Sequence, residues 1–382
     1  MTGSARRRND LDWLRVLAVL LLVPFHAALI FVQNPYSIMY VKDTVNSRFL
    51  DAMAGCIHQF HMPLLFVVAG MTSFLALGVR SWSQYLQERF TRLFIPLLFG
   101  VVFLLPPMTY LTQLSRGRQI SFWQHYQGFF RIDPAHLDGI GGTFTPAHLW
   151  FILYLFLFSL LALPFFVQLR RLGSQAALRR LAGFFEKPLA VFLFALPLAL
   201  AASIDLLGDK NPLVYFSVFF FGYVLMTDER YQQAIDRHTW LALLVGVFFQ
   251  YLRLAWRVQA PEWSALWIVY GLMEQFNRWL WVLGILGLGH RFLTRGGKVL
   301  AYLTASSFPF YILHLPVTTL VGYGLIRLPL GWMVKYPLIV LLSTLATFLV
   351  YEAARRVAPL RFALGMKTPA RRLALDAAAP GA

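Results

Sequence analysis

The chain has 382 residues, of which 58% are hydrophobic and 13% are charged, and its mean hydropathy is +0.61. Soluble proteins carry about 25% charged residues, so this composition excludes an ordinary soluble enzyme and a disordered chain. The one cysteine, Cys56, excludes a disulfide framework and a cysteine-based metal site. The composition instead predicts an all-α, polytopic bundle of membrane-spanning helices.

A helix needs roughly 20 apolar residues to cross a bilayer core of about 30 Å. On that basis we predict one domain over residues 1–368 and a disordered tail over 369–382. The domain is expected to hold ten spans, at 12–33, 53–78, 93–114, 148–169, 188–207, 212–227, 239–257, 264–289, 299–325 and 335–354. The first span follows three arginines, but it is too long for a signal peptide and lacks a small-x-small cleavage site, so we expect it to be retained.

The net charge of +17 comes from 34 Lys and Arg against 17 Asp and Glu. These cations punctuate the apolar stretches and form no single stripe, so no nucleic-acid partner is expected. With Arg6–Arg8 inside, the inner segments hold 22 of the 34 cations and the outer loops hold 10. The positive-inside rule therefore predicts that both termini are cytoplasmic.

The outward loops at 34–52 and 115–147 are the longest stretches that we expect to be non-helical. The second combines aromatic residues such as Trp123 with carboxylates such as Asp133. Such a mixture fits a sugar-binding face, and it fits the aromatic belt at a membrane interface better.

Arg15 and His26 are ionisable residues within the first span, where such groups are costly and often mark function. They are eleven residues apart, so a straight helix places them on one face with a separation of about 16 Å. Pro24 should open the helix just before His26. A base in catalysis and a hydrogen-bonded core histidine are equally compatible with the position of His26.

The second span carries His58 and His61 three residues apart, and with His26 they could form a three-imidazole metal site. The chain offers no HExxH motif or added carboxylate for such a site, which disfavours a metal. In the eighth span, Glu274 and Arg278 have the i, i+4 spacing of an intrahelical ion pair, which is at least as plausible as a catalytic role.

The ninth span places Ser307, Tyr311 and His314 on one helix face. Seven residues of helix separate Ser307 from His314 by about 10 Å, too far for a direct nucleophile–base contact, so this face is predicted to line a cavity. Arg89 and Arg92 precede the third span and could bind the phosphates of an anionic cofactor, although the positive-inside rule alone also predicts arginines there.

These features occur in an order that resembles the membrane acyltransferase-3 family. Leu11–Arg15 followed by Phe25–His26 is similar to the family's Arg-x10-His signature. Four later segments resemble its other motifs, in the same order: Ile57–Gly70, Arg89–Leu93, His148–Phe151 and Ser307–His314. Within the family, the chain is most similar to the periplasmic glucan succinyltransferase branch, through the segments Val23–His26, Ala147–Trp150 and Tyr351–Glu352.

The resemblance implies an O-acyltransferase of the cell inner membrane with no bound cofactor. Its co-substrate would be a cytoplasmic acyl-CoA, succinyl-CoA or acetyl-CoA, and its acceptor a glycan, glucan or other envelope carbohydrate. His26 would be the catalytic base, Arg15 would orient the donor, and Arg89 and Arg92 would hold the CoA phosphates. The other residues that the resemblance or the spans suggest for substrate or donor binding are Asp12, His61, His148, Trp150, Glu274, Arg278, Ser307 and His314.

Two departures from the glucan branch concern the acceptor. His61 and Pro63 stand where that branch often has Arg and another residue, and Ala69 replaces its usual Ser before Gly70. A transporter or flippase of an anionic or acylated solute is the alternative, because such proteins also place polar residues at membrane depth. The absence of inverted repeats in the sequence weighs mildly against it. The acyl group, the oligomeric state and a direct or relayed transfer stay open.

Overall fold

The computed structural model describes residues 8–32, 41–134, 137, 141–255 and 264–366, and these residues form helices and loops with no strand. They divide into two compact units. Unit 1 comprises residues up to Ala18, Gly55–Gln87 and Leu157–Leu300, and unit 2 comprises Val19–Ala54, Glu88–Phe156 and the residues from Ala301 onward. The predicted all-helical class is confirmed, whereas the predicted tail at 369–382 lies outside the described residues.

Seven helical stretches in the described part of the chain are long and apolar enough to cross a membrane, and an eighth is possible if one bent pair counts as a single span. The bent pair joins Ser174–Phe185 to Ala190–Ala202 at an angle of 117°. Two further predicted spans are not among these seven. The span predicted at 212–227 corresponds to α11 (Pro212–Leu225), which has only 14 residues. The span predicted at 264–289 corresponds to α13 (Ala265–Phe292), which carries two charged residues at mid-length. The structure thus supports a multi-pass protein, and ten spans stay a prediction.

The first span is a broken helix. It consists of α1 (Asn9–Leu20) and α2 (Leu22–Leu29), with the break at Leu21. Pro24 explains the position of this break, because a proline has no N–H to donate to the carbonyl four residues earlier, at Leu20. The Pro24 carbonyl itself accepts a hydrogen bond of 3.3 Å from the Tyr336 hydroxyl.

Unit 1 packs around the middle of α3 (Arg48–Val79). A Cβ atom at Gly70 would lie 1.9 Å from the Phe219 carbonyl oxygen of α11, and one at Gly222 would lie 2.1 Å from the Val67 oxygen. The two backbones can approach this closely only because both positions are glycine, as is usual where helices pack within a membrane.

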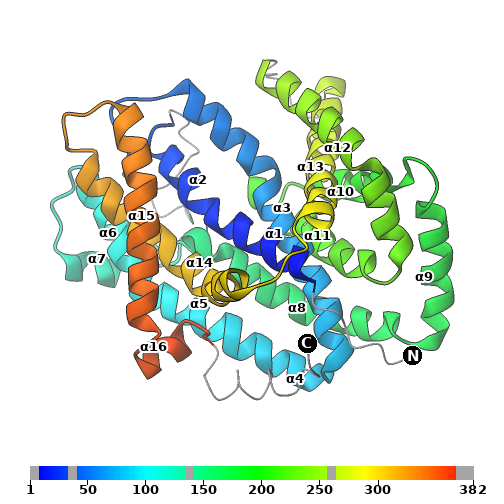
Figure 1. The fold of residues 1–382 in the computed structure, drawn as a ribbon. Coiled ribbons are helices and arrows are strands. Elements are labelled where there is room, and N and C mark those ends of the chain that lie inside the picture. Colours follow the sequence, from blue (N-terminus) through cyan, green and yellow to red (C-terminus); the bar gives the residue numbers. More distant parts are fainter. Residues whose placement is uncertain (1–7, 33–40, 135–136, 138–140, 256–263, 367–382) are drawn as a thin grey trace. The chain divides into compact units, whose positions relative to one another are not determined.

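Other helices of unit 1 precede or follow α11 in the sequence. They include the later part of α8 (Trp150–Leu169), α9 (Leu172–Phe185), α10 (Ala195–Ala202) and α12 (Glu229–Ala255). α12 and α13 pack side by side (Figure 1), with Gly287 against Thr239. This pairing places the polar residues near the end of α12 beside those in the middle of α13.

The third span runs over Trp82–Ser115 without a gap, and it lies in unit 2 from Glu88 onward. It consists of α4 (Trp82–Arg89), η1 (Phe90–Phe94), α5 (Ile95–Phe99), η2 (Gly100–Leu104) and α6 (Leu105–Ser115). η1 and η2 are π-helical turns. Pro96 and Pro106 follow these turns closely, and because they cannot donate hydrogen bonds they favour such local widening of the helix.

The outward segment 115–147, predicted to be non-helical, contains the short helix α7 (Phe122–Phe129), so that prediction was wrong in part. Ser121 and Gln124 form a capping box at its start, which the sequence reading overlooked. Inside this helix, His125 Nε2 lies 2.9 Å from the Thr109 hydroxyl of α6. Of the other outward segment, 34–52, residues 34–40 lie outside the described residues, and the prediction was wrong from Arg48 onward, where α3 begins.

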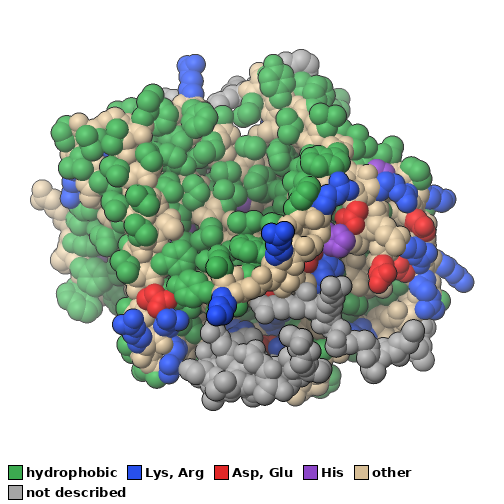
Figure 2. All heavy atoms as spheres, viewed as in Figure 1, with side chains coloured by type: hydrophobic (Ala, Val, Ile, Leu, Met, Phe, Trp, Pro, Cys, Tyr) green, Lys and Arg blue, Asp and Glu red, His purple; other side chains and the backbone are tan. Residues whose placement is uncertain are grey.

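Unit 2 is completed by α14 (Lys298–Leu325), α15 (Trp332–Ala354) and α16 (Ala358–Ala363), and α15 packs against α2 (Figure 1). Figure 2 shows hydrophobic side chains along the face of α15, with charged side chains gathered at the end near α16. Leu341, Leu345 and Leu349, at successive turns of α15, are exposed, which suits contact with lipid chains. Near the start of α15 the buried Lys335 forms a 2.7 Å ion pair with the buried Asp43.

Candidate functional site

Three imidazoles from three different helices meet in the core of unit 2. His26 lies on α2, His148 on the 3₁₀ turn η3 (Ala147–Leu149) that precedes α8, and His314 on α14. The ring centroid of His314 is 5.2 Å from that of His26 and 5.3 Å from that of His148. All three side chains are buried. The structure therefore brings together one predicted catalytic residue and two predicted substrate-binding residues.

Hydrogen bonds to backbone carbonyls define the tautomers of two of these rings. His314 Nδ1 lies 2.6 Å from the Tyr311 carbonyl oxygen, and His148 Nε2 lies 3.0 Å from that of Ile312. A carbonyl oxygen only accepts, so each of these nitrogens carries the proton. The opposite nitrogen of a neutral ring then holds a lone pair. For His314 Nε2 and His148 Nδ1, the described residues provide no hydrogen-bond partner.

Tyr311 links the two helices that carry these histidines. Its hydroxyl donates a short hydrogen bond to the His148 carbonyl. The preceding residue, Ala147, has a φ of +42°, a conformation that side-chain-bearing residues rarely adopt. Such strain persists only where surrounding contacts hold it, and here it fixes the direction in which His148 enters the cluster.

The other predicted residues near this cluster have structural partners. The Ser307 hydroxyl donates to the Thr304 carbonyl at 3.0 Å within its own helix, as serines inside helices commonly do. Trp150 packs edge to face against Tyr154, with ring centroids 5.2 Å apart. The Ser307 hydroxyl therefore has a partner within its own helix, and the prediction that its helix face lines a cavity stays a prediction.

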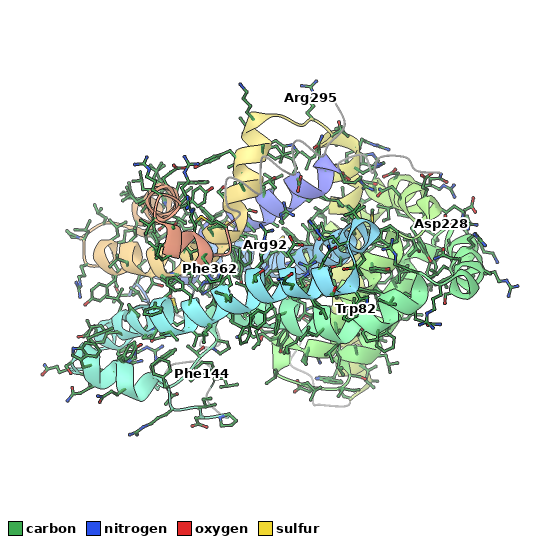
Figure 3. The ribbon with its side chains drawn as sticks, turned by 90° about the horizontal axis from the view of Figure 1, so that it is seen from below. Trp82, Arg92, Phe144, Asp228, Arg295 and Phe362 are labelled. Atoms are coloured by element: carbon green, nitrogen blue, oxygen red, sulfur yellow. The ribbon has the colours of Figure 1, made fainter. Side chains whose placement is uncertain are left out.

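Arg89 is the residue directly before the π-helical turn η1, and Arg92 lies within that turn. Both side chains are half-buried. Arg92 Nη1 is 3.8 Å from a carboxylate oxygen of Glu88, one turn earlier. Figure 3 shows Arg92 beside the segment that carries Phe362, and a Cβ atom at Gly365 would lie 3.2 Å from the Arg92 carbonyl oxygen. The helix that carries the two arginines is thus in contact with Gly365, near the end of the described residues.

Arg15 belongs to unit 1, whereas His26 belongs to unit 2. Arg15 Nη2 forms a 2.7 Å ion pair with the Asp12 carboxylate on the same helix, α1. The predicted Asp12 and Arg15 are therefore partners. Their link to His26 is the broken first span, which carries all three residues in sequence.

The predicted His61, Glu274 and Arg278 lie in unit 1. His61 Nδ1 donates to the Ile57 carbonyl at 2.9 Å, and its ring centroid is 5.7 Å from that of His58. A carboxylate oxygen of Glu274 lies 3.6 Å from Arg278 Nη2 and 4.0 Å from Arg253 Nη1. Among the described residues, no three His, Cys, Asp or Glu side chains group as a metal site would require.

Arg253 is a polar residue of this group that the sequence reading did not single out. Its Nη2 donates to the Gly55 carbonyl at 2.9 Å. With the Gln59 amide oriented so that its oxygen faces Arg253, that oxygen accepts from Nη1 at 2.7 Å and from Nε at 3.2 Å. The signal was present, because an arginine inside the predicted span 239–257 is as costly as Arg278 in its own span.

Comparison with known proteins identifies the family of the chain. The model of the acyltransferase-3 family, described as an acyltransferase domain, matches residues 8–352. "Glucans biosynthesis protein C" of Salmonella typhimurium (strain LT2) is 22% identical over 96% of this chain and 97% of its own length. For the proteins of that name from Shigella dysenteriae (27% identical) and Escherichia coli K12 (26%), the match spans 44% of this chain and 40% of theirs. No solved structure matches.

Proposed function

The chain belongs to the acyltransferase-3 family, and from this premise we propose that it is an integral-membrane O-acyltransferase that moves a succinyl or acetyl group from acyl-CoA to a hydroxyl of an envelope glycan. The convergence of His26, His148 and His314 is the observation that supports the proposal best. Acyl transfer to an alcohol needs a base, and a neutral imidazole with a lone-pair nitrogen is the side chain most suited to that task near neutral pH.

In the proposed reaction, His26 accepts the proton of the acceptor hydroxyl as its oxygen attacks the thioester carbonyl. The tetrahedral intermediate then collapses, the carbon–sulfur bond breaks, and the CoA thiolate takes up the proton. His148 and His314 would line the same site and present their lone-pair nitrogens to polar groups of the substrates. Arg15 keeps the role that the resemblance implies for it, which is to orient the acyl donor.

We assign the phosphates of acyl-CoA to Arg89 and Arg92. Guanidinium groups bind phosphates with paired hydrogen bonds, and the π-helical turn that carries them is a feature often found at functional sites. The proposal places these arginines and both termini at the cytoplasmic side of the inner membrane, where acyl-CoA is available, and the acceptor glycan at the opposite side.

The test is the consumption of succinyl-CoA and of acetyl-CoA by the purified protein with a glucan acceptor, followed by mass spectrometry of the glucan. We expect an acyl mass increment on the glucan with one of the donors, and its loss in His26→Ala. His290→Gln is the matched control, because that partly exposed histidine pairs with Asp236 in unit 1. Wild-type turnover by His26→Ala would refute the role of His26.

The same preparation distinguishes the enzyme from a transporter. Flux of an anionic solute into liposomes without any acyl donor, together with no acyl-CoA consumption, would contradict the proposed function and favour the transporter.

A further inference from the structure

We propose that Arg253 and Arg278, on neighbouring helices of unit 1, form a binding site for one oxyanion, the carboxylate or phosphate group of a ligand. The inference does not depend on the proposed acyl transfer, because it concerns groups that the reaction above does not use. It is based on the charge balance, the free hydrogen-bonding edge and the burial of these side chains.

The charges of the group do not cancel. Arg253 and Arg278 bring two positive charges, and Glu274 is the carboxylate paired with both of them. The other polar side chains that contact these arginines, Gln59 and Gln275, are neutral amides. Among the described residues of this group, one positive charge therefore stays uncompensated, in surroundings where an isolated charge is costly.

The hydrogen bonds of Arg278 leave one edge of its guanidinium open. Nη1 donates to the Gln275 side-chain oxygen at 2.8 Å. Nη2 is 3.6 Å from Glu274, which is longer than a hydrogen bond, and the buried Nε has no hydrogen-bond partner among the described residues. Nε and Nη2 form the side-on edge that binds a carboxylate or phosphate with two parallel hydrogen bonds.

Burial makes this open edge significant. Arg278 is only 6% exposed, so leaving its Nε–H group without an acceptor costs folding free energy. We therefore expect a ligand to provide that acceptor. Arg253 is held in place by the Gly55 carbonyl and by Gln59, so its position is set before any ligand binds. A single oxyanion would satisfy the open edge of Arg278 and compensate the excess charge.

Equilibrium dialysis of the purified full chain against labelled succinate and against labelled inorganic phosphate tests the site. We expect saturable binding of at least one of these anions, weakened about tenfold or more in Arg278→Gln and in Arg253→Gln, because each removes charge-assisted hydrogen bonds. Glu274→Gln should instead bind the anion more tightly, since it removes the competing carboxylate. This opposite sign separates an anion site from a purely structural ion-pair network.

Arg170→Gln is the matched control, because exposed Arg170 donates to the Phe74 carbonyl at 3.3 Å in the same unit. Arg278→Lys and size-exclusion chromatography check that lost binding is not lost folding. Displacement of phosphate by phosphatidylglycerol but not by phosphatidylcholine in nanodiscs would identify a lipid headgroup as the source of the anion, and no displacement would identify a soluble ligand. No saturable binding of either anion, or equal affinities in Glu274→Gln and the wild type, would overturn the proposal.

Discussion

The imidazole of His314 lies 5.2 Å from that of His26, although the two residues come from nearly opposite ends of the chain. Helices α2 and α14 thus deliver their histidines to one point in unit 2, and η3 adds His148 from the middle of the sequence. A base that acts inside a protein needs neighbours that fix its tautomer and orientation. In this cluster, backbone carbonyls fix the tautomers of His314 and His148, the two rings beside His26.

The first prediction concerns these lone-pair nitrogens. In His314→Asn the side-chain amide can still donate to the Tyr311 carbonyl, and in His148→Gln it can still donate to that of Ile312. Neither variant keeps a titratable nitrogen. If the rings take part in proton transfer or bind the reacting groups, we expect acyl transfer to fall by about 10²-fold or more while the protein stays folded.

Tyr311→Phe is the comparison for that experiment. It removes only the hydrogen bond to the His148 carbonyl, worth about 1 kcal/mol, so turnover should fall by no more than about tenfold. Acyl-CoA consumption and the melting temperature in detergent are the measurements. Near wild-type turnover in both His314→Asn and His148→Gln would show that the cluster is only a packing feature.

Much of the fold follows from hydropathy, because a run of apolar residues long enough to cross a bilayer can hardly be anything but a helix. The break before His26 also follows from one residue, Pro24. Periodicity places Ser307, Tyr311 and His314 on one helix face, but it says nothing about which other helix faces them. The meeting of His314 with His26 and His148 depends on long-range packing, which no local pattern encodes.

The pairing of charges was harder to foresee for the same reason. Glu274 and Arg278 are one turn apart, so sequence spacing finds them. Arg253 contacts Glu274 only because α12 packs against α13. Asp43 and Lys335 form an ion pair although they are 292 positions apart in the sequence.

The second prediction concerns the close approach of α3 and α11. A methyl group at Gly70 or Gly222 would collide with a backbone carbonyl oxygen, which cannot move aside as a side chain can. We expect Gly70→Ala and Gly222→Ala each to destabilise the fold by about 1 to 3 kcal/mol, as overpacking does, with a lower melting temperature in detergent. Gly271→Ala is the control, because no atom lies within 4 Å of its added Cβ, and alanine there should be neutral or slightly stabilising. Equal melting temperatures for all three variants would contradict the helix contact.

The third prediction concerns the buried ion pair of Asp43 and Lys335. Lys335 also donates to the Ile326 carbonyl at 2.9 Å, and Asp43 accepts from the Val45 N–H at 2.9 Å, so both groups are well satisfied. Lys335→Met would leave a buried carboxylate without its cation, and we expect a loss of about 3 to 5 kcal/mol in the free energy of unfolding.

The double variant with Asp43→Leu should recover much of that loss, because it removes both charges together. Arg355→Met provides the surface comparison: its pair with Glu352 is partly exposed, and such pairs contribute at most about 1 kcal/mol. Thermal unfolding in detergent measures all three. A Lys335→Met variant no less stable than Arg355→Met would show that the buried pair does not stabilise the fold.

The last prediction concerns pH and Lys42, which lies in the segment between α2 and α3. Its amine donates to the carbonyls of Leu29 at 2.6 Å and Val32 at 3.1 Å. Burial, and to a smaller extent the nearby charge of Arg116, lower the pKa of Lys42 from its usual 10.5 to about 8, while Asp51 opposes the shift. Between about pH 8 and pH 10.5 the unfolded chain therefore binds more protons at this position than the folded protein, so the contribution of Lys42 to the free energy of unfolding rises with pH across that window.

We expect the melting temperature of the wild type, measured relative to Lys42→Met, to increase between pH 8 and pH 10, by an amount that corresponds to about 1 to 3 kcal/mol. Below pH 7.5 the difference between the two proteins should be constant, because Lys42 is then protonated in both states. Labelling of Lys42 with an amine-reactive ester, followed by peptide mass spectrometry, gives an independent measure, since only the neutral amine reacts. A difference in melting temperature that falls with pH, together with labelling that begins only near pH 10, would contradict the lowered pKa.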